Sequence, residues 1–195
     1  MLGTSTGAIL DSHDGGAKWN NLKAFEDAIT QLIFIQKAPG TILALKQGKQ
    51  VVISRNNGTT WEEKEQSLLP LPSFTNNDQG PQSADTGAQN TIFADQYIPG
   101  LLYTGTNQGL YRSHDYGVTW EALNVLESSK NFPIRAIAVN PKNSREIVYV
   151  AGSAFYKSTD NGATWSTVNL PISRTANILE YDPYDPNTLY ISLRK

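Results

Sequence analysis

The sequence contains no cysteine, only two histidines and one methionine, and few charged residues for its length of 195. The absence of cysteine excludes disulfides, thiolate metal ligands and cysteine nucleophiles. Charged residues make up 17% of the chain and the formal net charge is -2, so no basic surplus is available to neutralise a phosphate backbone. We therefore expect no nucleic-acid partner.

Long apolar runs are also missing, since no stretch approaches the roughly 18 consecutive apolar residues of a transmembrane helix. The amino end, Met1 to Gly7, has neither a charged start nor an apolar core and predicts no signal segment in this chain. We expect no membrane insertion. The length suits a single domain over residues 1–195 with a substantial buried core.

What the sequence does contain is an octet of the form Ser-x-Asp/Asn-x-Gly-x-x-Trp, which occurs four times. Asp and Asn side chains bond the adjacent backbone and glycine tolerates positive φ, so each octet predicts a tight hairpin turn. The tryptophan opens the next strand, where its burial would hold neighbouring sheets together. The residues that define the four octets, to which we assign structural roles, are Ser12, Asp14, Gly16, Trp19, Ser54, Asn56, Gly58, Trp61, Ser113, Asp115, Gly117, Trp120, Ser158, Asp160, Gly162 and Trp165.

Short apolar and β-branched segments precede each octet with the same period, as half-buried strands require. Predicted first strands lie at 33–35, 92–94, 137–139 and 179–181, and predicted second strands at 42–45, 101–104, 147–150 and 189–192. Third strands run into each octet. The pattern predicts an all-β chain.

Four such octets at near-regular spacing resemble the Asp-box, or BNR, repeat. In that family the octet lies between the third and outermost strands of a propeller blade. The turns at Asn140-Pro141 and Asp182-Pro183 resemble those of the photosystem II assembly and stability factors and of sortilin. The resemblance implies a β-propeller of four-stranded antiparallel blades with Asp-box hairpins, and an extracytoplasmic location in the periplasm or outside the cell.

The period predicts four blades, with blade 2 at 26–69, blade 3 at 91–127 and blade 4 at 132–172. Since the first octet lacks preceding strands, blade 1 is expected to combine residues 1–25 with residues 176–195, which would join the two ends of the chain. Two arrangements stay open. The four blades form a self-closed ring, or they form half of a larger ring that a homodimer completes through the terminal blade.

Residues 66–90 form the largest departure from the period, a polar insertion with several prolines. Long loops on a rigid scaffold often carry binding, and the same composition is typical of a disordered segment. The sequence leaves both interpretations open.

Few side chains suggest chemistry beyond the repeat. His13 and His114 share an octet position at a turn tip, where separate blades would keep them apart, so we predict no metal site and no cofactor. Asp95 and Asp182 occupy equivalent turn positions, so we interpret both carboxylates as turn formers rather than as the acid pair of a glycoside hydrolase.

Glu180 breaks the pattern, because it replaces Phe34, Phe93 and Ala138 in the first strand, which lines the channel of a propeller. A carboxylate there must face water or pair with a cation. The candidate ligand-contacting residues are Glu180, Arg135 and Arg174.

Three classes of protein share the repeat. Sialidases carry a Phe-Arg-Ile-Pro element that is absent here, and xyloglucanase-type hydrolases use a cleft between two propellers, so enzymatic activity is disfavoured. No catalytic residue is assigned. The sequence predicts a non-catalytic scaffold that binds a protein or peptide partner. The alternative is a glycan-binding propeller or a glycoside hydrolase of the sialidase or xyloglucanase kind, for which exposed tyrosines could stack on sugars.

Overall fold

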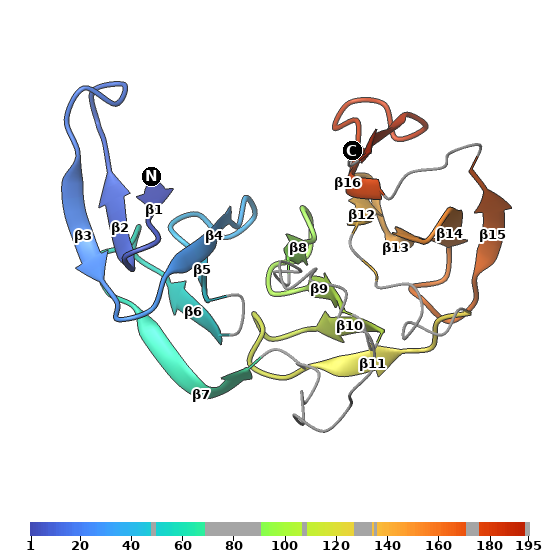
Figure 1. Cartoon of the computed structure of the whole chain (residues 1–195), viewed down its shortest axis with the longest axis horizontal. Helices are drawn as coiled ribbons and strands as arrows, with labels where there is room; N and C mark the ends of the chain where they lie inside the picture. Colours follow the sequence, from blue (N-terminus) through green and yellow to red (C-terminus); the bar gives the residue numbers. More distant parts are fainter. Residues whose placement is uncertain are drawn as a thin grey trace, which may run out of the picture.

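A computed structural model describes residues 1–47, 50–68, 91–106, 109–126, 134, 136–170 and 176–193. The regular structure in these ranges consists of β-sheets arranged along an open arc, in which the strands follow one another from the inner side to the outer rim, as from β8 to β11 (Figure 1). None of the described segments forms a helix long and apolar enough to cross a membrane.

The strands form five antiparallel sheets, each built from consecutive strands. The first blade contains β1 (Leu2–Gly3), β2 (Ala8–Asp11) and β3 (Asn20–Ala24). The second blade contains β4 (Ile29–Phe34), β5 (Ile42–Lys46), β6 (Gln50–Ser54) and β7 (Glu62–Leu68). The third blade contains β8 (Ile92–Ala94), β9 (Leu102–Gly105), β10 (Leu110–Ser113) and β11 (Glu121–Leu123). The fourth blade contains β12 (Ala136–Asn140), β13 (Asn143–Ala151), β14 (Ala154–Ser158) and β15 (Ser166–Asn169), and the terminal pair contains β16 (Ala176–Tyr181) and β17 (Leu189–Leu193).

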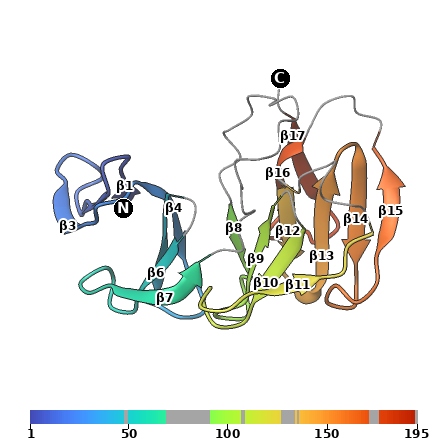
Figure 2. The same ribbon diagram turned by 60° about the horizontal axis from the view of Figure 1, so that its bottom comes forward.

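The two ends of the chain do not share a sheet. β1, β2 and β3 form a three-stranded sheet, while β16 and β17 pair with each other in a separate one. The ends lie apart on the open side of the arc (Figures 1 and 2). The blade predicted from residues 1–25 and 176–195 is therefore not formed, and neither is the self-closed ring. The reason is that β1 already occupies the second-strand position beside β2. The structure is that of a partial propeller.

The hydrophobic core lies between the blades, because successive side chains of each strand point to opposite faces. In β5, Leu43 and Leu45 pack toward the third blade, while Ala44 packs toward the first. In β13, Tyr149 packs toward the third blade and Val148 toward the terminal pair. Each blade is thus fixed by its neighbours along the arc.

Each Asp-box is a hydrogen-bonded hairpin turn. In all four, the serine Oγ accepts the N–H of the box glycine at 2.8 Å. One Oδ of the Asp or Asn accepts the backbone N–H four residues further on at 2.8–2.9 Å. The glycines have φ of 85–93°, and the residue before each glycine is also left-handed. Glycine adopts such angles without steric cost, although the preceding left-handed position holds Asn57, Tyr116 and Asn161 in the last three boxes.

The boxes also join the blades. A Cβ added to Gly117 or Gly162 would lie 3.1 or 3.2 Å from Val51 or Leu123 of the preceding blade. The tryptophans of the last three boxes are half-buried, each against the blade that precedes its own. The Trp61 ring, for example, contacts the Phe25 ring edge-on, with 5.9 Å between the ring centroids. Trp19 has no preceding blade among the described residues and is 46% exposed.

Candidate functional site

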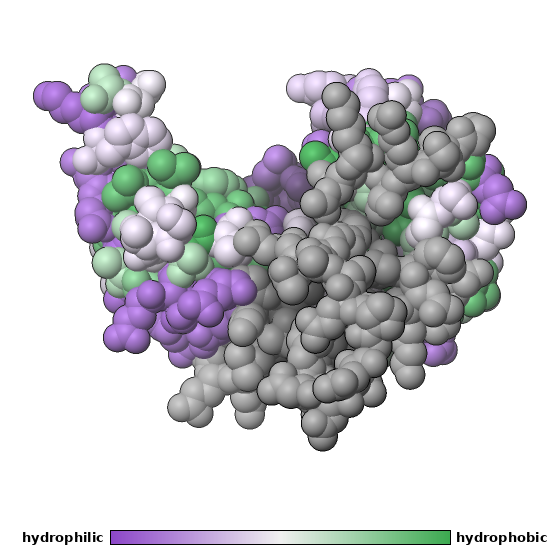
Figure 3. Space-filling view, in the orientation of Figure 1, coloured by the Kyte–Doolittle hydropathy of each residue, from purple (hydrophilic) through white to green (hydrophobic). Residues whose placement is uncertain are grey.

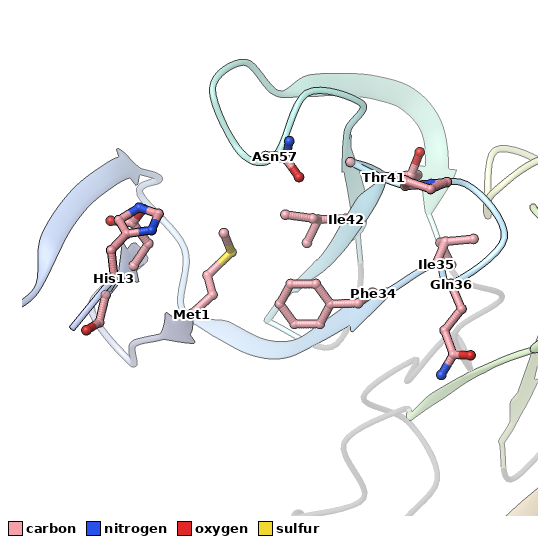
Figure 4. A pocket seen from close by; sticks show the side chains of 12 residues that line it. Met1, His13, Phe34, Ile35, Gln36, Thr41, Ile42 and Asn57 are labelled. Atoms are coloured by element: carbon pink, nitrogen blue, oxygen red, sulfur yellow. The ribbon is translucent and has the colours of Figure 1, made fainter. Parts of the chain in front are cut away.

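A pocket of about 530 Å³ opens between the first and second blades (Figure 4). Met1, Asp11 and His13 line it from the first blade, and Phe34 and Ile42 line it from β4 and β5. The second Asp-box contributes Asn57. In Figure 4 the Phe34 ring and Met1 lie between His13 on one side and the β4–β5 turn on the other. The pocket therefore lies at a junction of two blades.

The next junction along the arc, between the second and third blades, is filled. Tyr116, the fourth residue of its box, packs on Gly100 of its own blade and against the core cluster that the second and third blades share. The Arg55 guanidinium lies 4.8 Å from the Tyr116 ring centroid. The positions that correspond to Arg55 and Tyr116 in the first and second boxes hold His13 and Asn57. The first blade also has three strands where the next three blades have four among the described residues, and Met1 lines the pocket on that side.

The junction between the third and fourth blades is filled by Arg112, which directly precedes its box. Its Nη1 donates to the Asn161 carbonyl oxygen at 2.9 Å and its Nε donates to Glu121 Oε1 at 2.8 Å. The Tyr103 hydroxyl donates to Asn161 Oδ1 at 3.4 Å, and burial raises the pKa of Tyr103 to about 12. The first blade has Asp11 in place of Arg112, so the charge at this position is reversed.

Asp11 is the acidic residue among those that line the pocket. Its Oδ2 lies 2.8 Å from His13 Nε2, and the two side chains are 14% and 82% exposed, respectively. Asp11 Oδ1 is buried and has no hydrogen-bond partner among the described residues. The residues that line the pocket include no lysine and no arginine. The pocket therefore combines an apolar wall with a mostly buried carboxylate that His13 contacts.

Glu180 lies on β16 opposite Tyr190 of β17, and both side chains are exposed. Ile178, on the same face of β16, is 52% exposed, whereas Leu179 packs against the fourth blade. Glu180 thus lies on the open face of the terminal pair. Its predicted partners Arg135 and Arg174 lie outside the described residues.

The alignment of Glu180 with Phe34 was wrong by one position. Phe93 pairs with Tyr103, Ala138 with Val148 and Glu180 with Tyr190, and the corresponding pair of the second blade is Ile33 with Leu43. The turn fixes this register. Ile35 N–H donates to the Thr41 carbonyl oxygen, and Asp95 N–H donates to the Leu101 carbonyl oxygen at the same place in the next blade. Apolar triplets alone did not reveal it.

The two aspartates interpreted as turn formers make turn contacts. Asp95 Oδ1 accepts the N–H groups of Tyr97 and Ile98, both at 2.7 Å. Asp182 Oδ1 accepts those of Tyr184 and Asp185 at 2.8 and 3.0 Å. These bonds lower the pKa of Asp182. Within the described ranges no group of three or more His, Cys, Asp or Glu side chains could hold a metal ion.

Sequence reasoning missed the residues of the pocket. Asp11 and Phe34 lie far apart in the chain and meet only across a junction of blades. The sequence did contain a signal for these residues. Asn57 and Tyr116 are both the fourth residue of an octet, and Asp11 and Arg112 both directly precede an octet. Comparison of those positions across the repeats could have indicated one open junction. The predicted insertion at 66–90 contributes β7 up to Leu68, and its remainder lies outside the described residues.

Comparison with known proteins agrees with this architecture. The family model described as "Sortilin, neurotensin receptor 3" matches residues 108–195. A xyloglucanase from Paenibacillus sp is 29% identical over 121 residues, which are 55% of this chain and 12% of that protein. The crystal structure of the Niastella koreensis GH74 enzyme has a TM-score of 0.69 at 19% identity, covering 97% of this chain and 30% of that one.

YCF48 bound to D1 peptide has a TM-score of 0.55 at 18% identity, covering 97% of this chain and 55% of that chain. This chain spans 12–23% of the length of the curated relatives that it matches. The fold and the four boxes define the class: the chain is an Asp-box β-propeller. Within that class, residues 108–195 are similar to the sortilin family model, and the fold is similar to that of YCF48.

Proposed function

We propose that the chain is a non-catalytic propeller that binds a protein or peptide partner. The observation that carries the proposal is the pocket between the first two Asp-boxes, whose volume of about 530 Å³ suits a few side chains. An apolar wall with a few polar groups is the usual lining of a binding site. The likeness to YCF48 bound to D1 peptide, over 97% of this chain, supports the same class of ligand.

A second candidate function is the binding or cleavage of a polysaccharide, which the xyloglucanase relatives favour. Glycoside hydrolysis by the common mechanisms needs two carboxylates on either side of the scissile bond. Asp95 and Asp182 each accept two backbone N–H groups in separate turns, and Asp95 is 4% exposed. Their bonding supports a structural role for both side chains.

A direct comparison of ligand classes tests the proposal. The purified chain would be immobilised and panned against a random peptide library, and titrated in parallel with xyloglucan oligosaccharides by calorimetry. We expect enriched peptides that bind saturably and no saturable heat from the oligosaccharides. Release of reducing ends from xyloglucan, or oligosaccharide binding without peptide enrichment, would favour the second candidate instead.

We also propose an extracytoplasmic location, which rests on the resemblance to Asp-box propellers alone. Cell fractionation with an antibody against the chain would test it. Recovery with cytoplasmic markers would contradict the proposal.

A further inference from the structure

We infer that a patch at the junction between the second and third blades binds an acidic segment of a peptide. Lys37, Arg55, Tyr97, Ile98 and Tyr116 make up this cation–tyrosine patch. Acidic side chains of the peptide pair with Lys37 and Arg55, and an apolar side chain next to them lies on Tyr97 and Ile98. The inference rests on the proposed function and names the class of peptide, at a surface one junction along the arc from the pocket.

The second blade supplies both cations of the patch and the third blade supplies both tyrosine rings. Lys37 Nζ lies 5.4 Å from the Tyr97 ring centroid, and these two residues come from the turns that follow β4 and β8. Arg55 Cζ lies 4.8 Å from the Tyr116 ring centroid, and these two come from the Asp-boxes. In both blades the fourth box residue donates its backbone N–H to the carbonyl oxygen of a turn glycine at 2.9–3.0 Å. Turns and boxes therefore share one face of the arc.

The third blade presents Tyr97 and Ile98 on a fixed turn. Asp95 is 4% exposed, and its Oδ1 accepts the backbone N–H groups of both residues at 2.7 Å. The two side chains are nevertheless 48% and 46% exposed. Because the turn is already held in place, a ligand that covers these side chains pays little for ordering the backbone. The turn thus offers a preformed apolar contact.

The cations of the patch lack the close carboxylate that cations elsewhere in the described arc have. Three such ion pairs, at 2.7–2.8 Å, are Lys46 with Glu63, Arg112 with Glu121 and Lys157 with Glu146. By contrast, Arg55 Nε lies 4.0 Å from Glu62 Oε1, and the Arg55 side chain is 47% exposed. Lys37 is exposed and forms no ion pair with another described residue.

The tyrosine rings leave both cations able to bind an anion. A guanidinium that stacks on an aromatic ring keeps its in-plane N–H groups for a carboxylate, and an ammonium has three donors. Hydrogen bonds between charged groups are the strong ones. The patch is therefore a positive surface on a chain whose formal net charge is -2, and carboxylates are the ligands that it fits.

The apolar part of the patch favours a peptide over an acidic sugar. A sugar ring can stack on Tyr97 but finds no flat surface on Ile98, whereas an apolar amino-acid side chain contacts both. The turns that carry Lys37 and Tyr97 follow β4 and β8 on the inner side of the arc (Figure 1). The space-filling view shows an open hollow between the two arms of the arc on that side (Figure 3). An extended chain has room to approach there.

The test uses capped pentapeptides, Ac-Ala-X-Leu-X-Ala-NH2, in which X is glutamate, glutamine or lysine, and a galacturonic acid trisaccharide as the sugar probe. Binding would be followed by the amide chemical shifts of ¹⁵N-labelled protein. We expect saturable shifts at Lys37, Arg55 and Tyr97 with the glutamate peptide, and affinity weaker by about tenfold or more with the glutamine and lysine peptides. Equal affinity for the glutamate and glutamine peptides, or tighter binding of the trisaccharide, would overturn the inference.

Substitutions with matched length probe the two cations. Lys37→Met and Arg55→Met should each weaken binding of the glutamate peptide about three- to fivefold, as expected for exposed charge pairs. Lys142→Met is the matched control, because Lys142 is the exposed lysine at the corresponding turn position of the fourth blade and its ammonium donates to the Tyr184 carbonyl oxygen. This variant should bind normally. An equal loss in all three variants would mean that overall charge attracts the peptide, and would contradict the patch.

The outcomes separate this inference from the proposed function. Library peptides that bind saturably without an acidic residue, and that bind the Lys37→Met and Arg55→Met variants normally, would overturn the inference and leave the proposed function standing. A chain that binds neither the glutamate peptide nor any library peptide would contradict both.

Discussion

The first and third junctions of the arc are built from the same repeat positions and differ in what fills them. Between the third and fourth blades, Arg112 reaches across to the next box and closes the space. Between the first and second blades, the Asp11 side chain contacts His13 two residues further on, and a pocket remains. The octet fixes the turn in both cases. The comparison teaches that the residues around the octet help to decide whether a junction is filled by its own side chains or keeps a pocket.

The largest expected effect concerns the box tryptophans at covered and uncovered junctions. Trp120 packs on the core between the second and third blades, whereas Trp19 is 46% exposed. Both indole N–H groups donate to the carbonyl oxygen of their box glycine at 3.0 Å. The loss of this hydrogen bond therefore contributes equally to both variants. Trp120→Ala should lower the free energy of unfolding by about 2–4 kcal/mol. Trp19→Ala should lower it by less than about 1 kcal/mol.

Urea unfolding followed by circular dichroism measures both tryptophan variants. Equal losses would break the comparison, because they would mean that the first box is covered in solution by a surface that the arc does not show.

The second effect concerns the two arginines at the filled junctions. Arg112→Met removes the bonds to the Asn161 carbonyl and to Glu121 while it keeps the length of the side chain. We expect a loss of about 1.5–3 kcal/mol, since the Arg112 side chain is 14% exposed. Arg55→Met removes a more exposed contact with the Tyr116 ring and should cost about 0.5–1 kcal/mol. The same urea experiment ranks the two, and a reversed order would contradict the junction scheme.

The smallest effect compares an aspartate box with an asparagine box. Hydrogen bonds from the Thr164 side chain and backbone and from Ser158 lower the pKa of Asp160 from 3.8 to about 2. Because the folded-state pKa is lowered, the stabilisation is complete above pH 4 and is lost as the pH falls from about 4 to 2. In the second box Asn56 accepts the equivalent backbone N–H of Thr60 at 2.8 Å without titrating.

Asp160→Asn should therefore reduce the decrease in the urea midpoint of unfolding between pH 4 and pH 2. At pH 7 the midpoint of the variant should differ little from that of the unmodified chain. Midpoints of variant and unmodified chain at the three pH values provide the measurement. An unchanged acid slope would mean that Asp160 is not protonated in that window.

The sequence was sufficient for the features that depend on local bonding. Ser54, Asn56 and Gly58 bond within a single octet, so their arrangement follows from spacing alone. The ring closure could not be derived in this way, because it depends on whether β17 or β1 pairs with β2. The pocket depends on packing between blades, which the period of the repeat does not encode.

The open arc has a consequence for the order in which parts of the molecule unfold. Each hydrophobic cluster joins only adjacent blades among the described residues, so the structure behaves as a one-dimensional array of units. Opening the first blade or the terminal pair breaks one interface, whereas opening the third blade breaks two. Amide hydrogen exchange should therefore be slowest in β9 and β13 and fastest in β2 and β17, a gradient that runs outward from the middle of the chain.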